Sequence, residues 1–91
     1  MPNTTLQLEW EPKALKKFDD MIKRIPLFHR QIAYQVVQRK APENAKARGA
    51  TQVEEADIVR AFLCEVPHAF YSLMVRLLDE VGFKYQQYEV K

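Results

Sequence analysis

Two histidines and one cysteine are the residues of this 91-residue chain that could bind a transition metal or begin nucleophilic chemistry. Cys64 and His68 stand four positions apart in "CEVPH", a spacing that metal sites use, and His29 is the other soft donor. A tetrahedral zinc site needs three or four ligands, which these residues do not supply at one place. We therefore expect that these residues form no metal site. Cys64 is predicted to be buried, and His68 is predicted to stand at a helix start.

Acid–base and phosphate chemistry are disfavoured in the same way. Neighbouring carboxylates on a helix splay apart and are typical of a solvated surface. Three such pairs occur: Asp19–Asp20, Glu54–Glu55 and Asp79–Glu80. Ser72 has no glycine elbow around it, and Gly49 and Gly82 are isolated, so neither a hydrolase triad nor a phosphate loop is indicated. We expect no catalytic residue and no cofactor, and favour a protein that is not an enzyme by itself.

The stretch "RIPLFHR" is the strongest candidate for a binding site. Pro26 suits a helix start, and Phe28 begins the apolar stripe of that helix, which predicts a core position for Phe28. Arg30 lies about 200° further around the helix, where its guanidinium is expected to stay in water. It then either forms a surface ion pair or presents its planar fork to a partner's carboxylate or phosphate, with His29 as a donor beside it.

Trp10 is the third candidate binding residue. It falls outside the apolar stripes, as do Tyr85 and Tyr88 in the tail. Such aromatic residues either cover the core as a hydrophobic lid or form an exposed contact surface.

The elements that must position these residues are predicted from apolar periodicity. The first helix starts at Pro12 and stops at Ile25, because a residue before proline is disfavoured in the helical region. Its stripe comprises Leu15, Phe18, Met21, Ile22 and Ile25. The second helix starts at Pro26 with a stripe of Phe28, Ile32, Ala33, Val36 and Val37. Pro42 removes one hydrogen bond, so we expect a kink or a restart there, and Gly49 is the expected cap.

Two further helices follow. Thr51 and Glu54 form a possible capping box for the third helix, whose stripe comprises Ile58, Val59, Phe62, Leu63 and Val66. Pro67 starts or kinks the fourth helix, which Gly82 ends. Its stripe comprises Phe70, Leu73, Met74, Leu77, Leu78 and Val81. The remaining residues are expected to be an ordered or half-ordered tail on the bundle.

Composition agrees with one folded helical domain over residues 1–91. The chain is 47% hydrophobic and 29% charged, with only two glycines. We expect an all-α fold, a small orthogonal bundle of about four helices with a short C-terminal tail. No apolar run reaches the length of a membrane span and no basic segment precedes an apolar one near the N-terminus, so we expect a cytoplasmic protein without membrane contact.

The net charge of +2 is unevenly distributed. Residues 1–50 carry ten Lys and Arg against five Asp and Glu, whereas residues 51–91 carry four against seven. A chain of this kind packs one half against the other or docks an acidic partner, but a solvated basic face is the favoured interpretation.

Four segments together resemble a known domain: "LEWEPKALKKF", "RIPLFHR", "ENAKARGA" and "VEEADIVRAF". They resemble the small domain at the C-terminus of one subunit of the light-independent protochlorophyllide reductase, a domain that also occurs as short free-standing proteins. The resemblance covers about residues 8–62, and residues 63–91 extend past it. The matching residues are Trp10, Ala14, Ile25, Pro26, Phe28, Arg30, Glu43, Gly49, Val53 and Glu54. Pro42 departs from the pattern, because such proteins usually continue a helix there.

The resemblance implies an appended module and not the catalyst, since one cysteine cannot hold a four-cysteine cluster. We expect a non-catalytic helical module that docks a redox or tetrapyrrole-metabolism protein, using the basic first half and the region of Trp10 and Arg30. The alternative is a small DNA-binding protein, because "VEEADIVRAF" is similar to the stretch before the last helix of archaeal histones. Lys40, Lys46 and Arg48 would then contact DNA.

Overall fold

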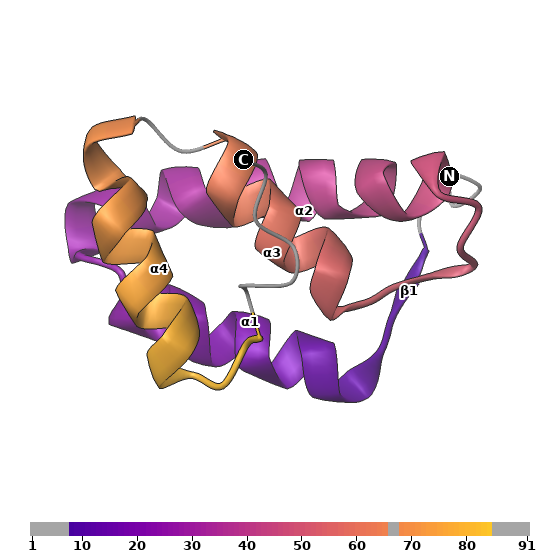
Figure 1. Ribbon diagram of the computed structural model, residues 1–91, viewed down its shortest axis with the longest axis horizontal. Helices are drawn as coiled ribbons and strands as arrows, with labels where there is room; N and C mark the ends of the chain where they lie inside the picture. The colour runs from indigo at the N-terminus through magenta and orange to yellow at the C-terminus, as the bar shows by residue number, and fades with distance from the viewer. Residues whose placement is uncertain (1–7, 66–67, 85–91) are drawn as a thin grey trace.

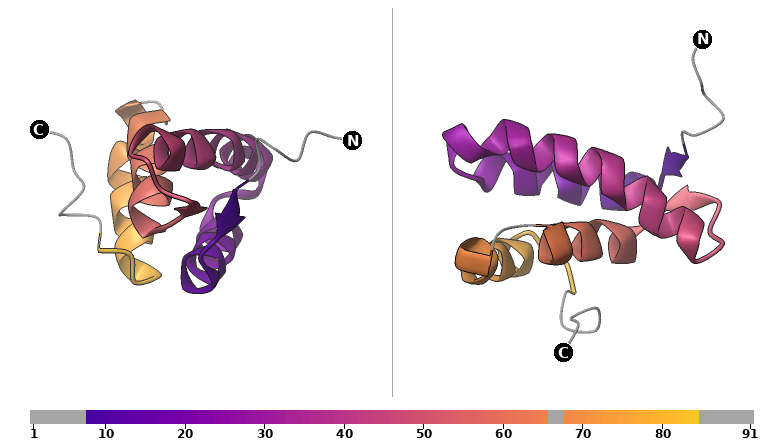
Figure 2. Two further views of the ribbon diagram at one scale, coloured as in Figure 1. Left: turned by 90° about the vertical axis from the view of Figure 1, so that its right-hand side faces the viewer. Right: turned by 90° about the horizontal axis from the view of Figure 1, so that it is seen from above.

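The computed structural model describes residues 8–65 and 68–84. They form four α-helices: α1 (Pro12–Arg24), α2 (Leu27–Ala47), α3 (Glu55–Glu65) and α4 (Tyr71–Glu80), with a 3₁₀ turn, η2 (His68–Phe70), leading into α4 (Figure 1). α1 and α2 lie on one side of the molecule and α3 and α4 on the other (Figure 2). The prediction of a small all-α bundle is confirmed.

The bounds of α1 follow from its end residues. Glu11 caps the helix, because its side chain accepts a hydrogen bond of 2.8 Å from the backbone N–H of Ala14. Pro12 occupies the first turn, as predicted. The helix stops before Ile25, whose backbone is extended ahead of Pro26.

α2 continues through Pro42 as one helix of 21 residues, so the expected restart at Pro42 does not occur. Proline costs the helix one hydrogen bond, but the residues around it are tightly packed. Ala41 and Ala45 are fully buried against the neighbouring elements. Their small side chains let α3 approach closely, and this packing holds the helix together past the proline.

Both glycines end helices, as predicted. Gly49 follows α2 at φ +77° and Gly82 follows α4 at φ +91°. After each helix the backbone N–H groups fold back onto the last turn: Ala50 donates to the carbonyl of Ala45 and Phe83 donates to that of Leu78, each at 2.9 Å. These are Schellman motifs, which need a left-handed residue at the glycine position.

Two short strands were not predicted. β1 (Glu9–Trp10) pairs in parallel with β2 (Gln52–Val53), Glu9 opposite Gln52 and Trp10 opposite Val53. Because β2 is extended, α3 starts only at Glu55, and the predicted capping box of Thr51 and Glu54 is wrong. The cap of α3 lies three residues further along the chain than predicted. There the side chain of Asp57 accepts a hydrogen bond of 2.9 Å from the backbone N–H of Glu54.

The core is built from all four helices. The residues with the largest fully buried side chains include Phe18, Met21, Ile58, Phe62 and Leu78. All five lie on predicted stripes. The stripe of α2 is wrong in its first half, because Phe28 is 79% exposed and Ile32 is 63% exposed. The buried positions of α2 are Val37, Ala41 and Ala45, further along the helix.

Two other predictions need comment. Cys64 was expected to be buried, but it is exposed on the last turn of α3. Phe83 of the predicted tail is buried, whereas Tyr85, Tyr88 and the rest of the tail lie outside the described residues.

Candidate functional site

The exposed first half of α2 has a geometric origin. α2 has 21 residues and α3 has 11, so at about 1.5 Å per residue α2 is about 15 Å longer. Near the start of α3, Asn44 of α2 donates a hydrogen bond of 3.1 Å to the carbonyl of Asp57, so α3 packs against the second half of α2 (Figure 1). α3 therefore covers α2 only as far as its middle. Beyond that point, η2 and the start of α4 are the nearest elements, and they leave a groove.

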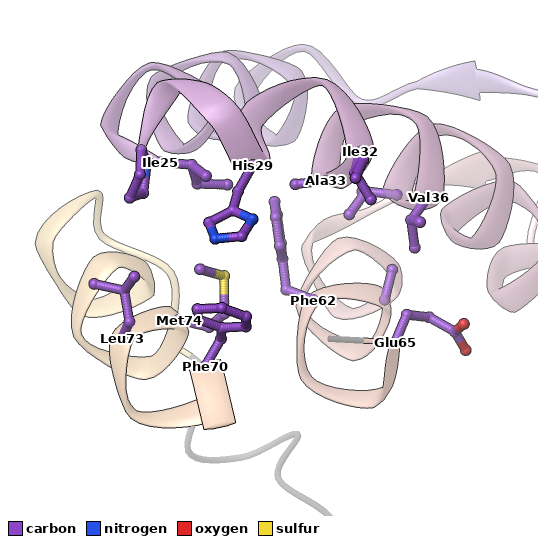
Figure 3. A pocket seen from close by; sticks show the side chains of 13 residues that line it. Ile25, His29, Ile32, Ala33, Val36, Phe62, Glu65, Phe70, Leu73 and Met74 are labelled. Carbon is purple, nitrogen blue, oxygen red and sulfur yellow. The ribbon is translucent and has the colours of Figure 1, made fainter. Parts of the chain in front are cut away.

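We call this opening the α2–α4 groove, a cavity of about 270 Å³. α2 forms one wall and α4 the other, with the end of α3 between them and the turn at Ile25 and Pro26 at one end (Figure 3). The side chains that argue for binding are His29 and Val36 from α2, Phe62 from α3, and Phe70, Leu73 and Met74 from η2 and α4. Of the thirteen lining residues, all but His29 and Glu65 are apolar, so the groove favours an apolar occupant.

His29 is the one candidate binding residue that lies in the groove. Its imidazole points toward Phe70 and Met74 (Figure 3). The ring centroid lies 4.6 Å from that of Phe70, edge to face, and 4.1 Å from that of Phe28. His29 is thus held between two aromatic rings, one inside the groove and one on its outer rim.

The rim of the groove is apolar and exposed. Leu27 is 75% exposed, and Phe28 and Ile32 occupy successive turns on the outer side of α2. Residues 31–38, "QIAYQVVQ", contain no charged side chain, although 29% of the chain is charged. Interface cores are depleted of charge and enriched in aromatic residues, and this face has both properties.

Arg30 turns away from the groove and binds the end of α1. Its Nη2 donates hydrogen bonds to the carbonyls of Lys23 at 2.9 Å and Ile25 at 3.1 Å, and its Nε donates to Ile25 at 3.3 Å. A cation there also meets the negative end of the α1 dipole. The guanidinium therefore does not extend freely into water as expected. A role for Arg30 in binding a partner stays a prediction.

Trp10 does not join His29 and Arg30. Its ring packs on Phe18 with centroids 5.2 Å apart, and Phe18 in turn stacks on Tyr34 at 5.6 Å. β1, which carries Trp10, lies at the opposite end of the long axis from the turn that precedes His29 (Figure 1). Trp10 is partly buried against the core, which favours the lid over the exposed contact surface.

A second cluster of polar residues stabilises the junction of α2 and α3. Asp57 is fully buried, and both its carboxylate oxygens accept hydrogen bonds of 2.8 Å from Arg48. The bond to Asp57, followed by that to Glu54, raises the pKa of Arg48 above its ordinary value. Hydrogen bonds from Gln52 and then Arg48 lower the pKa of Glu54 below its ordinary value of 4.5. Every group in this cluster is satisfied internally, as in a structural ion pair.

Four of the ten basic residues in the first half of the chain pair with carboxylates of the acidic second half. Lys17 lies 2.6 Å from Glu55, Arg24 lies 3.4 Å from Glu80, and Lys40 lies 3.8 Å from Glu65. Together with Arg48, these residues are paired across the fold. The favoured interpretation of a solvated basic face is wrong for these four cations, and two of the three residues named for DNA contact are among them.

Within residues 8–65 and 68–84, no group of three or more His, Cys, Asp and Glu side chains could hold a metal ion. The described helices include none that is long and apolar enough to cross a membrane. Comparison of the chain with protein-family models, curated proteins and solved structures finds no match. The argument for a function therefore depends on the groove and its rim.

The sequence analysis missed most of the groove, because Val36, Phe62, Phe70, Leu73 and Met74 were all assigned to the core. One signal could have located it. The charge-free run 31–38 is bounded by Arg30 and Arg39 on a helix that is otherwise rich in charge. Its apolar positions were interpreted as core because periodicity identifies an apolar face and not what covers it.

Proposed function

We propose that this protein is a non-catalytic helical interaction module that docks an apolar surface of another protein in the α2–α4 groove. The observation that supports the proposal is the exposure of Phe28 and Ile32 beside an apolar groove. Large exposed apolar side chains gathered at one place are costly in water and mark interaction sites. A helix of the partner that presents one large apolar side chain would fill the groove while its flanking residues cover the rim.

The proposed identity of the partner rests on the family resemblance. It implies a protein of redox or tetrapyrrole metabolism, and we propose the cytoplasm as the compartment where the two meet. The charge-free run supports a contact made by shape and apolar burial, because it offers no side chain for electrostatic steering.

Crosslinking in the producing cell tests the proposal. A photo-reactive benzophenone amino acid is placed at position 32, on the groove rim, and in a second preparation at position 51. Thr51 is exposed in the loop before β2, at the other end of α2, and serves as the matched control. We expect a discrete adduct with one heterologous protein from position 32 and none from position 51.

The adduct should disappear when Ala33→Leu fills the groove, and the crosslinked protein should belong to redox or tetrapyrrole metabolism. An adduct that survives Ala33→Leu in a folded variant, or that forms equally from position 51, would contradict docking in the groove. A crosslinked protein from unrelated metabolism would contradict the identity implied by the resemblance.

DNA binding is the weaker alternative. Lys40 pairs with Glu43 at 3.1 Å as well as with Glu65, and Arg48 pairs with Glu54 and Asp57. Phosphates would have to compete with these carboxylates. Lys46 is the third cation named for DNA contact. It is exposed, and none of the ion pairs described includes it.

A further inference from the structure

We propose that in the isolated chain the α2–α4 groove takes up Phe28 of a second copy, so that the module is a two-fold symmetric dimer. The inference rests on the proposed function, because the same groove is used. When no heterologous partner is present, a second copy of the chain occupies the groove. A heterologous partner would have to displace that copy.

The first argument is that a protruding side chain and a cavity lie on one face. Phe28 is 79% exposed, and its ring contacts His29, which lines the groove. In a two-fold symmetric interface the same patch faces itself, so it must carry both partners of each contact. A two-fold axis beside the first half of α2 places each Phe28 at the groove of the other copy, and the two insertions are equivalent.

The second argument is size. An apolar cavity of about 150 Å³ already admits a benzene ring, so the groove of about 270 Å³ has room for one phenyl ring. Apart from His29 and Glu65, its lining side chains are apolar or aromatic, which suits such a ring. The rings of His29 and Phe70 already meet edge to face there, and an inserted ring would extend that aromatic cluster.

The third argument is charge. In a two-fold symmetric interface, a charge close to the axis lies beside its own copy, which is unfavourable. Residues 31–38 carry no charge, and the guanidinium of Arg30 is bound to the end of α1. An axis beside residues 31–38 therefore meets no charged side chain of that run. Glu65, the charged residue that lines the groove, lies 3.8 Å from Lys40.

Sedimentation equilibrium over a dilution series tests the dimer with the full chain. We expect a reversible monomer–dimer equilibrium for the wild type. Phe28→Glu should raise the dimer dissociation constant at least about 30-fold, as expected for the loss of an interface hot spot. Thr51→Glu adds the same charge at the other end of α2 and should leave the constant unchanged. A wild type that is monomeric at every concentration, or a Phe28→Glu dimer as tight as the wild type, would overturn the proposal.

A mixing experiment tests the mutual insertion itself. Phe28→Ser removes the protruding ring and keeps the groove open, whereas Ala33→Leu fills the groove and keeps the ring. Each variant alone should be a folded monomer, as verified by circular dichroism and thermal melting. The mixture should form a mixed dimer, because one ring still meets one open groove. A mixture of folded variants that stays monomeric would contradict mutual insertion.

The two proposals fail in distinguishable ways. A monomeric chain that still gives the heterologous adduct at position 32 would overturn the dimer and support docking. A dimer whose position 32 crosslinks only to a second copy in cells would support the dimer and overturn the heterologous partner. A monomer without any adduct would overturn both.

Discussion

Arg30 and Arg48 are both basic residues beside a helix end, and both are bound by the folded chain itself. Arg30 binds backbone carbonyls at the end of α1, and Arg48 binds the buried carboxylate of Asp57. A guanidinium suits both places, because its planar fork can donate several hydrogen bonds at once. These residues show that a basic side chain near a candidate motif can be engaged by hydrogen bonds within the chain.

Arg48→Ala should strongly destabilise the fold. The carboxylate of Asp57 is fully buried and would keep only the backbone N–H of Glu54 as a hydrogen-bond donor. Depriving a buried acceptor of its hydrogen bonds costs about 1–3 kcal/mol, and the Arg48 side chain is 34% exposed, so the pair is only partly buried. Urea unfolding followed by circular dichroism measures the loss. Arg60→Ala, at an exposed position of α3, is the control, and an Arg48→Ala variant as stable as this control would show that Asp57 does not need its partner.

Phe28→Ala should change the stability of the monomer by no more than about 0.5 kcal/mol, as for other exposed positions. Phe62→Ala, which removes a fully buried ring, should cost about 3–5 kcal/mol. Unfolding at a concentration where the chain is monomeric separates these effects from dimerisation. A loss of several kcal/mol for Phe28→Ala would mean that its ring packs in the core, as the apolar stripe first predicts.

At the scale of the element, the second half of α2 is buried in the core, and its first half is exposed at the groove. Its second half carries Val37, Ala41 and Ala45 and is fixed against α3 despite Pro42. Its first half projects beyond α3 and carries the rim of the groove. Such a helix holds a docking surface in place without a loop, so little conformational entropy is lost when a partner binds.

The start of α3 provides a test of pH dependence. The pKa of Glu54 is lowered in the fold, so its ionised form stabilises the folded state above its ordinary pKa of 4.5. That contribution is lost as the pH falls through the lower folded value. Glu54→Gln should therefore be less stable than the wild type at neutral pH, and the difference should shrink as the pH falls below 4.5. Urea midpoints of both proteins over a pH series measure this, and a difference that stays constant would show that the charge of Glu54 does not contribute.

At the scale of the whole molecule, four of the ten basic residues of the first half pair with carboxylates of the second half across the fold. Lys17, for example, donates to both Glu55 and the carbonyl of Gly82, and so ties α1 to α3 and to the end of α4. Ion pairs of this kind are partly exposed and each contributes about 1 kcal/mol or less. Their effect is on recognition, because a polyanion would have to compete with carboxylates for these four cations.

Duplex DNA should therefore bind weakly and with a strong dependence on salt. A net charge of +2, with several cations already paired, can neutralise only a few phosphates. Fluorescence anisotropy with a labelled duplex at several salt concentrations measures the affinity and the slope. Tight binding at physiological salt would reverse the ranking and favour the DNA-binding alternative.

The local features of the fold could be predicted from the sequence alone. Pro12, Ile25 before Pro26, Gly49 and Gly82 mark helix ends, because backbone conformation at these positions depends on the residue itself and its neighbour. The stripes of α1, α3 and α4 identified Phe18, Phe62 and Leu78 as core, since a single apolar face on a short helix has to be buried.

Only the tertiary structure decided which apolar residues stay exposed. Phe28 and Ile32 recur at four-residue steps, whereas the buried Val37, Ala41 and Ala45 form a separate series, with Val37 about 180° around the helix from Phe28. Both series are apolar, and their spacing does not say which of the two faces is covered. The exposure of Phe28 and Ile32 follows from the lengths and positions of α3 and α4, which are contacts between segments far apart in the chain. The pairing of β1 with β2, the closure of Asp57 on Arg48 and the groove around His29 arise in the same way, because each depends on which elements meet and not on the residues of any one element.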